Sequence, residues 1–196
     1  HREWLQGRVA ELDQHDKTPD WFLRFFHKVG LSTDALAQMA DSGYSHFRDS
    51  VTPIPPQVRS VRDGEMIRIG EDDWQVIVGR GHSPEHACLF NAKTHIMISG
   101  DQILPTITPH IGIHASEPEA NPLQLYLDTL ANFDHLPADT LVLPAHGLPF
   151  YNLHPRLAYL RQHHAERLAI LEDFCTEPTR VLSTLKVMFR RQLNPF

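Results

Sequence analysis

Apolar side chains recur at helical spacing in the first part of the chain, residues 1–50. The pattern predicts three helices, over 3–14, 21–28 and 33–40. Thr18 precedes a proline and an acidic residue at the start of the second helix, so we expect its side chain to cap that helix. The aromatic face of the second helix is expected to pack against the core.

From residue 59 onward the pattern changes to short apolar runs separated by turn residues, which is typical of β-strands. The runs predict strands at 59–62, 66–69, 74–78, 87–90, 95–99 and 140–143. Asp63-Gly64 predicts a hairpin turn between the first two of them. The stretches 76–78 and 96–98 are apolar without alternation, so both faces of these strands should be covered. This indicates an α/β fold with helices layered outside a sheet.

Helical spacing returns after a loop at 104–119 that is rich in proline and histidine. Asn121 should cap a helix that runs to about residue 133, and further helices are predicted over 154–174 and 181–189. The predicted organisation has three parts: a helical segment at 1–50 that covers the sheet, a core at 51–153 and a helical appendage at 154–196.

Composition excludes some classes of partner. The formal net charge of the 196 residues is −6 and no long basic run occurs, which argues against a nucleic-acid partner. The uncharged stretches are too short to span a bilayer, so no membrane partner is expected. Cys88 and Cys175 are too few for a disulfide framework, and we expect them to be buried free thiols in a reducing cytoplasm. Homo-oligomer formation is left open.

Three side chains that can bind metal ions follow three of the predicted strands. His82, Asp101 and His146 each lie at such a strand end and next to a glycine. Two imidazoles and a carboxylate suit zinc, and also iron or manganese. Each residue alone has a structural alternative, as a loop residue hydrogen-bonded to backbone, but the repeated position favours a common site. His86 shares the loop of His82, and bracing that loop fits it better than ligation.

Three motifs in this region resemble those of a known family. The segments 81–86, 99–104 and 143–147 are similar, in order and spacing, to the later metal-binding motifs of the metallo-β-lactamase superfamily, and the resemblance covers about residues 60–150. It implies an αββα sandwich, incomplete at the N-terminus, with a mono- or dinuclear metal site at one edge of the sheets. The helical segments at both ends resemble the accessory segments of glyoxalase II-like hydrolases.

The resemblance also implies a role for each matching residue. His82 is similar to the ligand of a first metal ion, Asp101 to the catalytic carboxylate that bridges two ions, and His146 to the ligand of the second. His86 and Ser83 correspond to residues that brace the loop behind the ligands. Zinc is the expected metal, with two ions in the complete protein and iron or manganese as alternatives.

One motif of the superfamily is missing from this chain. The pattern His-x-His-x-Asp-His, which should precede the three motifs, does not occur in the 196 residues. We therefore expect the chain to be a fragment that begins downstream of this motif. The alternative is a natural short variant that binds metal poorly.

The function that the resemblance implies is metal-dependent hydrolysis of a small molecule. A metal-bound hydroxide would attack a thioester, an ester, a lactone or a similar group, and the chain by itself is expected to be inactive because part of the ligand set is missing. Two alternatives remain open, a non-catalytic interaction module with a degenerate fold and a member that processes RNA or another phosphodiester. The sequence does not identify the substrate.

Overall fold

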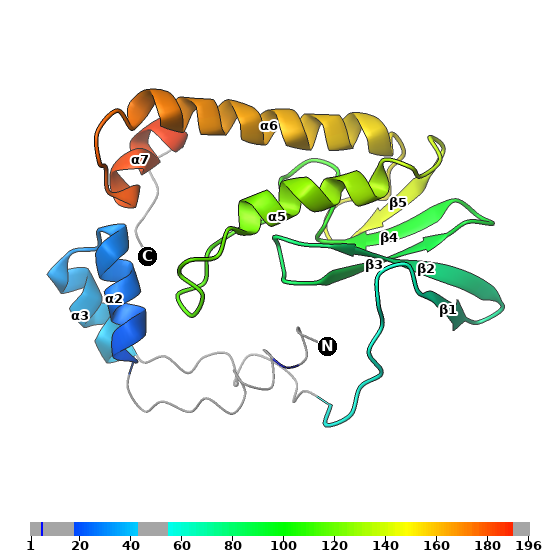
Figure 1. Cartoon of the computed structure of the whole chain (residues 1–196), viewed down its shortest axis with the longest axis horizontal. Helices are drawn as coiled ribbons and strands as arrows, with labels where there is room; N and C mark the ends of the chain where they lie inside the picture. Colours follow the sequence, from blue (N-terminus) through cyan, green and yellow to red (C-terminus); the bar gives the residue numbers. More distant parts are fainter. Residues whose placement is uncertain (1–4, 6–17, 43–54, 190–196) are drawn as a thin grey trace. The chain divides into compact units, whose positions relative to one another are not determined.

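The structure is a computed structural model that describes Leu5 and residues 18–42 and 55–189 (Figure 1). Apart from Leu5, the helix predicted over 3–14 lies outside the described residues. The described residues from 18 onward belong to two compact units: one contains residues 55–113 and 119–161, the other residues 18–42, 114–118 and 162–189. The predicted boundaries at residues 50 and 153 stay predictions.

The first unit is built around a five-stranded sheet with the order β1-β2-β3-β4-β5. Its strands are β1 (Met66–Ile69), β2 (Asp72–Gly79), β3 (His86–Asn91), β4 (Ile96–Gly100) and β5 (Leu141–Pro144). The first three pairings are antiparallel, and β4 pairs with β5 in parallel. A parallel pair needs a crossover, and the chain between β4 and β5 supplies it with the helix α5 (Pro122–Thr129) and the 3-10 helix η1 (Leu130–Phe133).

Turn chemistry explains the antiparallel connections. The turn between β1 and β2 contains Gly70, whose φ of 63° lies in the left-handed region that favours glycine. In the turn between β3 and β4, the Asn91 side-chain oxygen accepts hydrogen bonds from the backbone N–H groups of Lys93 and Thr94, each at 3.0 Å. Both turns were expected from the sequence.

The strand predicted at 59–62 is wrong. The backbone N–H of Arg62 donates to the Glu65 carboxylate at 3.0 Å, and the Glu65 N–H donates to the Arg62 carbonyl, so Asp63-Gly64 forms a local turn instead of joining two strands. The Asp63 carboxylate in addition accepts a hydrogen bond from the Val78 N–H at 2.7 Å. Backbone pairing with β2 ends at this turn, where Gly64 N donates to the Val76 carbonyl and Val76 N donates to the Glu65 carbonyl, each at 2.8 Å.

Helices cover one face of the sheet. The core contains β-strand side chains such as Cys88, Phe90 and Met97 together with helical side chains from α5, η1 and the start of α6 (Leu153–Phe174). Figure 1 shows α5 and the first part of α6 running along the sheet. Leu157 and Leu160 of α6 are fully buried in this core, as the helical spacing predicts.

The other face is only partly covered. Val76, Leu89 and Ile98 are register partners along one row across the sheet, on the opposite face from Phe90 and Met97. Val76 is fully buried, whereas Ile98 is 40% exposed. The expectation that both faces of 96–98 are covered is therefore wrong for Ile98.

The second unit is helical, with α2 (Asp20–Val29), α3 (Thr33–Ser42), the later part of α6 and α7 (Val181–Met188). Gly30, with φ 113°, ends α2 as predicted. The predicted cap by Thr18 is wrong, because its hydroxyl donates to the carbonyl of Met39 at 3.1 Å. No residue of α2 is fully buried. Its aromatic side chains, Trp21, Phe22, Phe25 and Phe26, are half-buried, and their packing against the core stays a prediction. Within the described residues, no helix has the length and apolar character needed to cross a membrane.

Candidate metal centre

The direction of the strands brings the three predicted ligands to one edge of the sheet. Because β3 is antiparallel to both β2 and β4, these two strands run the same way, and β5 runs parallel to β4. The carboxyl ends of β2, β4 and β5 therefore share an edge, which is where α/β sheets place their functional groups. His82, Asp101 and His146 each follow one of these ends.

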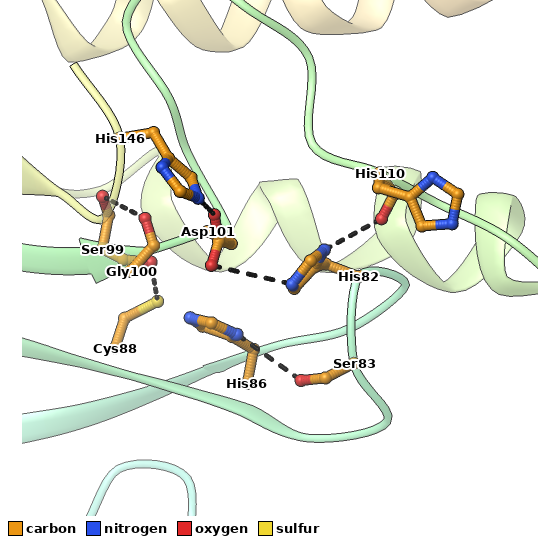
Figure 2. Close-up of polar contacts among 9 residues, drawn as sticks. All are labelled: His82, Ser83, His86, Cys88, Ser99, Gly100, Asp101, His110 and His146. Atoms are coloured by element: carbon orange, nitrogen blue, oxygen red, sulfur yellow. Dashed lines mark hydrogen bonds and ion pairs between the residues drawn. The ribbon is translucent and has the colours of Figure 1, made fainter. Parts of the chain in front are cut away.

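The three side chains converge on the carboxylate of Asp101. The Nε2 atom of His82 lies 3.7 Å from Asp101 Oδ2, and the Nε2 atom of His146 lies 3.3 Å from Asp101 Oδ1 (Figure 2). Each imidazole thus faces a different oxygen of the same carboxylate. A backbone hydrogen bond of 2.9 Å from Ala145 N to the Gly100 carbonyl ties the residues before His146 and Asp101 together.

The orientation of His82 is set from behind by a main-chain carbonyl. Its Nδ1 atom lies 2.9 Å from the carbonyl oxygen of His110, on the side away from Asp101 (Figure 2). A carbonyl oxygen can only accept, so Nδ1 carries the proton of this hydrogen bond. In the neutral ring, Nε2 then presents its lone pair to Asp101, which is the arrangement that metal-binding histidines use.

The donor set fits a metal ion between each imidazole and the carboxylate. An Nε2 lone pair and a carboxylate oxygen are both acceptors and repel each other unless a proton or a cation lies between them. Two ligand atoms on one tetrahedral zinc ion are about 3.4 Å apart, given Zn–N and Zn–O bonds of about 2.0–2.2 Å. The observed separations of 3.3 Å and 3.7 Å lie close to that value.

The three side chains do not form a closed site for one ion. Among the residues that the structure describes, no group of three or more His, Cys, Asp or Glu side chains is placed to hold a single ion. His82 and His146 instead face opposite oxygens of Asp101, so each position would receive one imidazole and one carboxylate oxygen from these residues. Structural zinc sites have four ligands, and catalytic ones have three protein ligands.

His86 and Ser83 lie beside the centre and contact one another. The Ser83 hydroxyl is 3.4 Å from His86 Nδ1, and the ring of His86 packs edge-on against that of His82 with 5.9 Å between centroids. On its other side, the His86 ring occupies the space that a Cβ on Gly100 would need. These contacts are compatible with the bracing role that the resemblance implies, and that role stays a prediction.

Cys88 lies close to the centre in Figure 2 but inside the core. It is fully buried, its Sγ is 3.4 Å from the Ser99 carbonyl, and burial raises the pKa of the thiol. Cys175 is exposed, which corrects the expectation that both thiols are buried.

We expect iodoacetamide at pH 8 to alkylate Cys175 and to leave Cys88 intact in the folded chain, because the thiolate is the nucleophile. Peptide mass mapping checks this, and rapid labelling of Cys88 without unfolding would contradict it.

Sequence reasoning missed two contributors to the site. The His110 carbonyl is a backbone group that any residue type would offer, so no pattern in the sequence points to it. Arg156 was likewise not singled out, although its guanidinium donates to two carbonyls of the loop that leads to His110. Its partners lie 52 and 49 residues away in the chain, beyond the reach of any local signal.

Comparison with known proteins agrees with this fold. A β-lactamase domain protein from Burkholderia ambifaria is 36% identical, with a TM-score of 0.86 over 98% of this chain and 53% of its own. A metallo-β-lactamase family protein from Thermus thermophilus, 23% identical, shares the fold with a TM-score of 0.70 over 97% of this chain and 57% of its own. The fold is therefore the metallo-β-lactamase fold.

Among curated proteins, the probable metallo-hydrolase YqjP of Bacillus subtilis (strain 168) is 28% identical over 148 residues, which are 70% of this chain and 44% of that protein. An uncharacterized protein of Aquifex aeolicus (strain VF5) is 28% identical over 140 residues, 71% of this chain and 64% of its own. No protein-family model matches the chain.

These relatives are metallo-β-lactamase family proteins and a probable metallo-hydrolase, so the resemblance found in the motifs and the expected α/β fold are confirmed. The chain spans between 44% and 64% of the length of these relatives. The hydrolase activity expected from the motifs stays a prediction for this chain. The glyoxalase II-like subtype, zinc and the cytoplasm stay predictions.

Proposed function

We propose that this chain carries one side of the metal centre of a hydrolase. The observation that supports this most is the pair of imidazole Nε2 atoms directed at the two oxygens of one carboxylate, 3.7 Å and 3.3 Å away. For His82, whose Nδ1 donates to the His110 carbonyl, Nε2 and the carboxylate oxygen are two acceptors, and this pairing is unfavourable unless a proton or a cation lies between them. The hydrogen bond from His82 Nδ1 to the His110 carbonyl excludes the neutral Nε2–H tautomer and leaves Nε2 free as a ligand, which is the tautomer that metal binding requires.

In this proposal each residue has a defined task. His82 and His146 would each hold one ion, and Asp101 would supply one carboxylate oxygen to each. When bound, the ions act as Lewis acids and lower the pKa of water. Zinc is the metal we propose, and the nitrogen and oxygen donors also suit iron and manganese.

The proposed substrates are small molecules with a thioester, ester or lactone carbonyl. The Asp101 side chain is only 26% exposed, whereas the His146 side chain is 66% exposed. A substrate would therefore approach from the side of His146. The carboxylate behind it stays shielded from bulk solvent, which strengthens its interaction with a cation.

The chain by itself should bind zinc weakly and hydrolyse little. The described donors give each ion one imidazole and one carboxylate oxygen, fewer than a catalytic zinc site uses. We expect zinc uptake in a titration against a chromophoric chelator, but no turnover of a thioester, lactone and phosphodiester panel above the rate with zinc alone.

The two parts of this experiment test different claims. Zinc uptake no greater than that of a His82→Ala, His146→Ala double variant would overturn the proposed centre. Turnover by the purified chain that the double variant lacks would overturn the expectation that the chain is inactive. Turnover of the phosphodiester alone would redirect the assignment from carbonyl substrates to phosphodiesters.

A further inference from the structure

The loop that orients His82 has little secondary structure of its own. Residues 104–113 contain no helix or strand, and among the described residues no backbone–backbone hydrogen bond involves them. Apolar contacts hold part of the loop, since Leu104 is buried and Ile111 packs against the core. Its polar groups need another partner, because unpaired carbonyls near a core are costly.

Arg156, on the first part of α6, supplies that partner. Its Nε donates to the Leu104 carbonyl at 2.6 Å and its Nη2 donates to the Ile107 carbonyl at 2.6 Å. The guanidinium also lies over the Tyr159 ring, 4.8 Å from the centroid. A fork of N–H donors with fixed geometry can hold two carbonyls at once, and hydrogen bonds from a charged donor are stronger than neutral ones.

The Arg156 guanidinium is not paired with a carboxylate among the described residues. No ion pair of Arg156 with Asp or Glu occurs in the described part of the chain, whereas Arg161 on the same helix binds Asp134 at 2.7 Å. Partial burial lowers the pKa of Arg156, so placing this cation here has a cost. The hydrogen bonds to the two loop carbonyls offset that cost, and they form only when the loop is in this position.

The path from Arg156 to the metal centre is short. Arg156 fixes the loop at Leu104 and Ile107, and His110, three residues after Ile107, offers the carbonyl that orients His82. We propose that Arg156 is a positioning residue for the metal centre: by holding this loop it keeps the His110 carbonyl against Nδ1 of His82, so that Nε2 faces Asp101. The consequence for metal binding rests on the proposed function, whereas the consequence for the His82 ring does not.

The test reads the His82 ring directly. In the chain labelled with ¹⁵N-histidine and free of metal, long-range ¹H–¹⁵N correlation spectra should show His82 as the single Nδ1–H tautomer at a pH where it is neutral. In Arg156→Ala we expect a mixture of tautomers for His82. Zn²⁺ affinity, measured by chelator competition, should fall about tenfold, as for other partners that orient metal-binding histidines.

Matched variants separate positioning from general stability. Arg161→Ala removes a guanidinium from the same helix together with its bond to Asp134, and it should leave the His82 tautomer and Zn²⁺ affinity unchanged. Arg156→Lys keeps the charge but loses the fork, so it should restore part of the wild-type signal. If Arg156→Ala does not fold, as judged by circular dichroism, the lysine variant decides, with partial tautomer mixing expected.

A wild-type tautomer in both Arg156 variants would overturn the proposal, as would equal changes in Arg156→Ala and Arg161→Ala. The proposed function can fail separately from this proposal. If neither the wild-type chain nor the two Arg156 variants bind Zn²⁺, the proposed metal centre is wrong. If the His82 tautomer still depends on Arg156 in that case, Arg156 still positions the His82 ring.

Discussion

Replacement of Asp101 by asparagine should lower the Zn²⁺ affinity of the chain by about a hundredfold or more. Asp101 is the group that His82 and His146 both face, so the substitution removes a charged ligand from both positions at once. Loss of a partner that only orients a ligand already costs about ten- to hundredfold in metal affinity, and loss of the bridging carboxylate should cost at least as much. Competition with a chromophoric chelator measures the change.

Asp139 offers a matched control for this variant. It forms a histidine–aspartate pair with His95, with the Nδ1 and Oδ1 atoms 2.8 Å apart, and the hydrogen bond from His95 lowers the pKa of the Asp139 carboxyl. That separation is a direct hydrogen bond with no room for an ion between the two groups. Asp139→Asn changes the net charge by the same amount but should change Zn²⁺ affinity by no more than about twofold. Removal of a group that orients a metal ligand would lower the affinity by about tenfold or more. Equal losses in both variants would contradict the assignment of Asp101.

Replacement of Gly81 by alanine should strongly destabilise the first unit and displace His82. Gly81 has φ 101°, and a Cβ placed there would lie 2.5 Å from the Cβ of Tyr126 and 2.7 Å from the Pro122 carbonyl oxygen. Both neighbours belong to α5, and Tyr126 is fully buried, so neither can move without cost. Backbone strain and overpacking together should cost about 2–5 kcal/mol, which urea unfolding measures.

Gly64 separates the two contributions to this loss. It has φ 76° but no atom within 4 Å of the position of a Cβ, so Gly64→Ala introduces backbone strain without a steric clash. It should cost only about 1–2 kcal/mol. A Gly81→Ala variant no less stable than Gly64→Ala would show that the loop around His82 does not depend on the close approach to α5.

The sequence predicts the ligands of the candidate site better than the groups that orient them. His82, Asp101 and His146 could be found because a strand end beside a glycine is a local pattern, and the strand directions then bring them to one edge. The His110 carbonyl and the contacts of Arg156 could not, since they join main-chain groups to side chains far away in the chain.

The errors in the fold have similar causes. The strand predicted at 59–62 is lost because the Glu65 carboxylate binds the backbone of Arg62, a competition that strand propensity does not include. Thr18 has the sequence context of a helix cap, but its hydroxyl donates a hydrogen bond to the Met39 carbonyl, 3.1 Å away. In both places a hydrogen bond formed by a side chain replaces the local structure that the sequence predicts, a strand in the first case and a helix cap in the second.

The most direct test is anomalous X-ray diffraction at the zinc absorption edge from crystals of this chain grown with excess Zn²⁺. We expect one anomalous peak beside His82 Nε2 and an oxygen of Asp101, and a second beside His146 Nε2 and the other oxygen. Peaks only at other histidines, with a direct hydrogen bond between Asp101 and a protonated His82 or His146, would contradict the proposed centre.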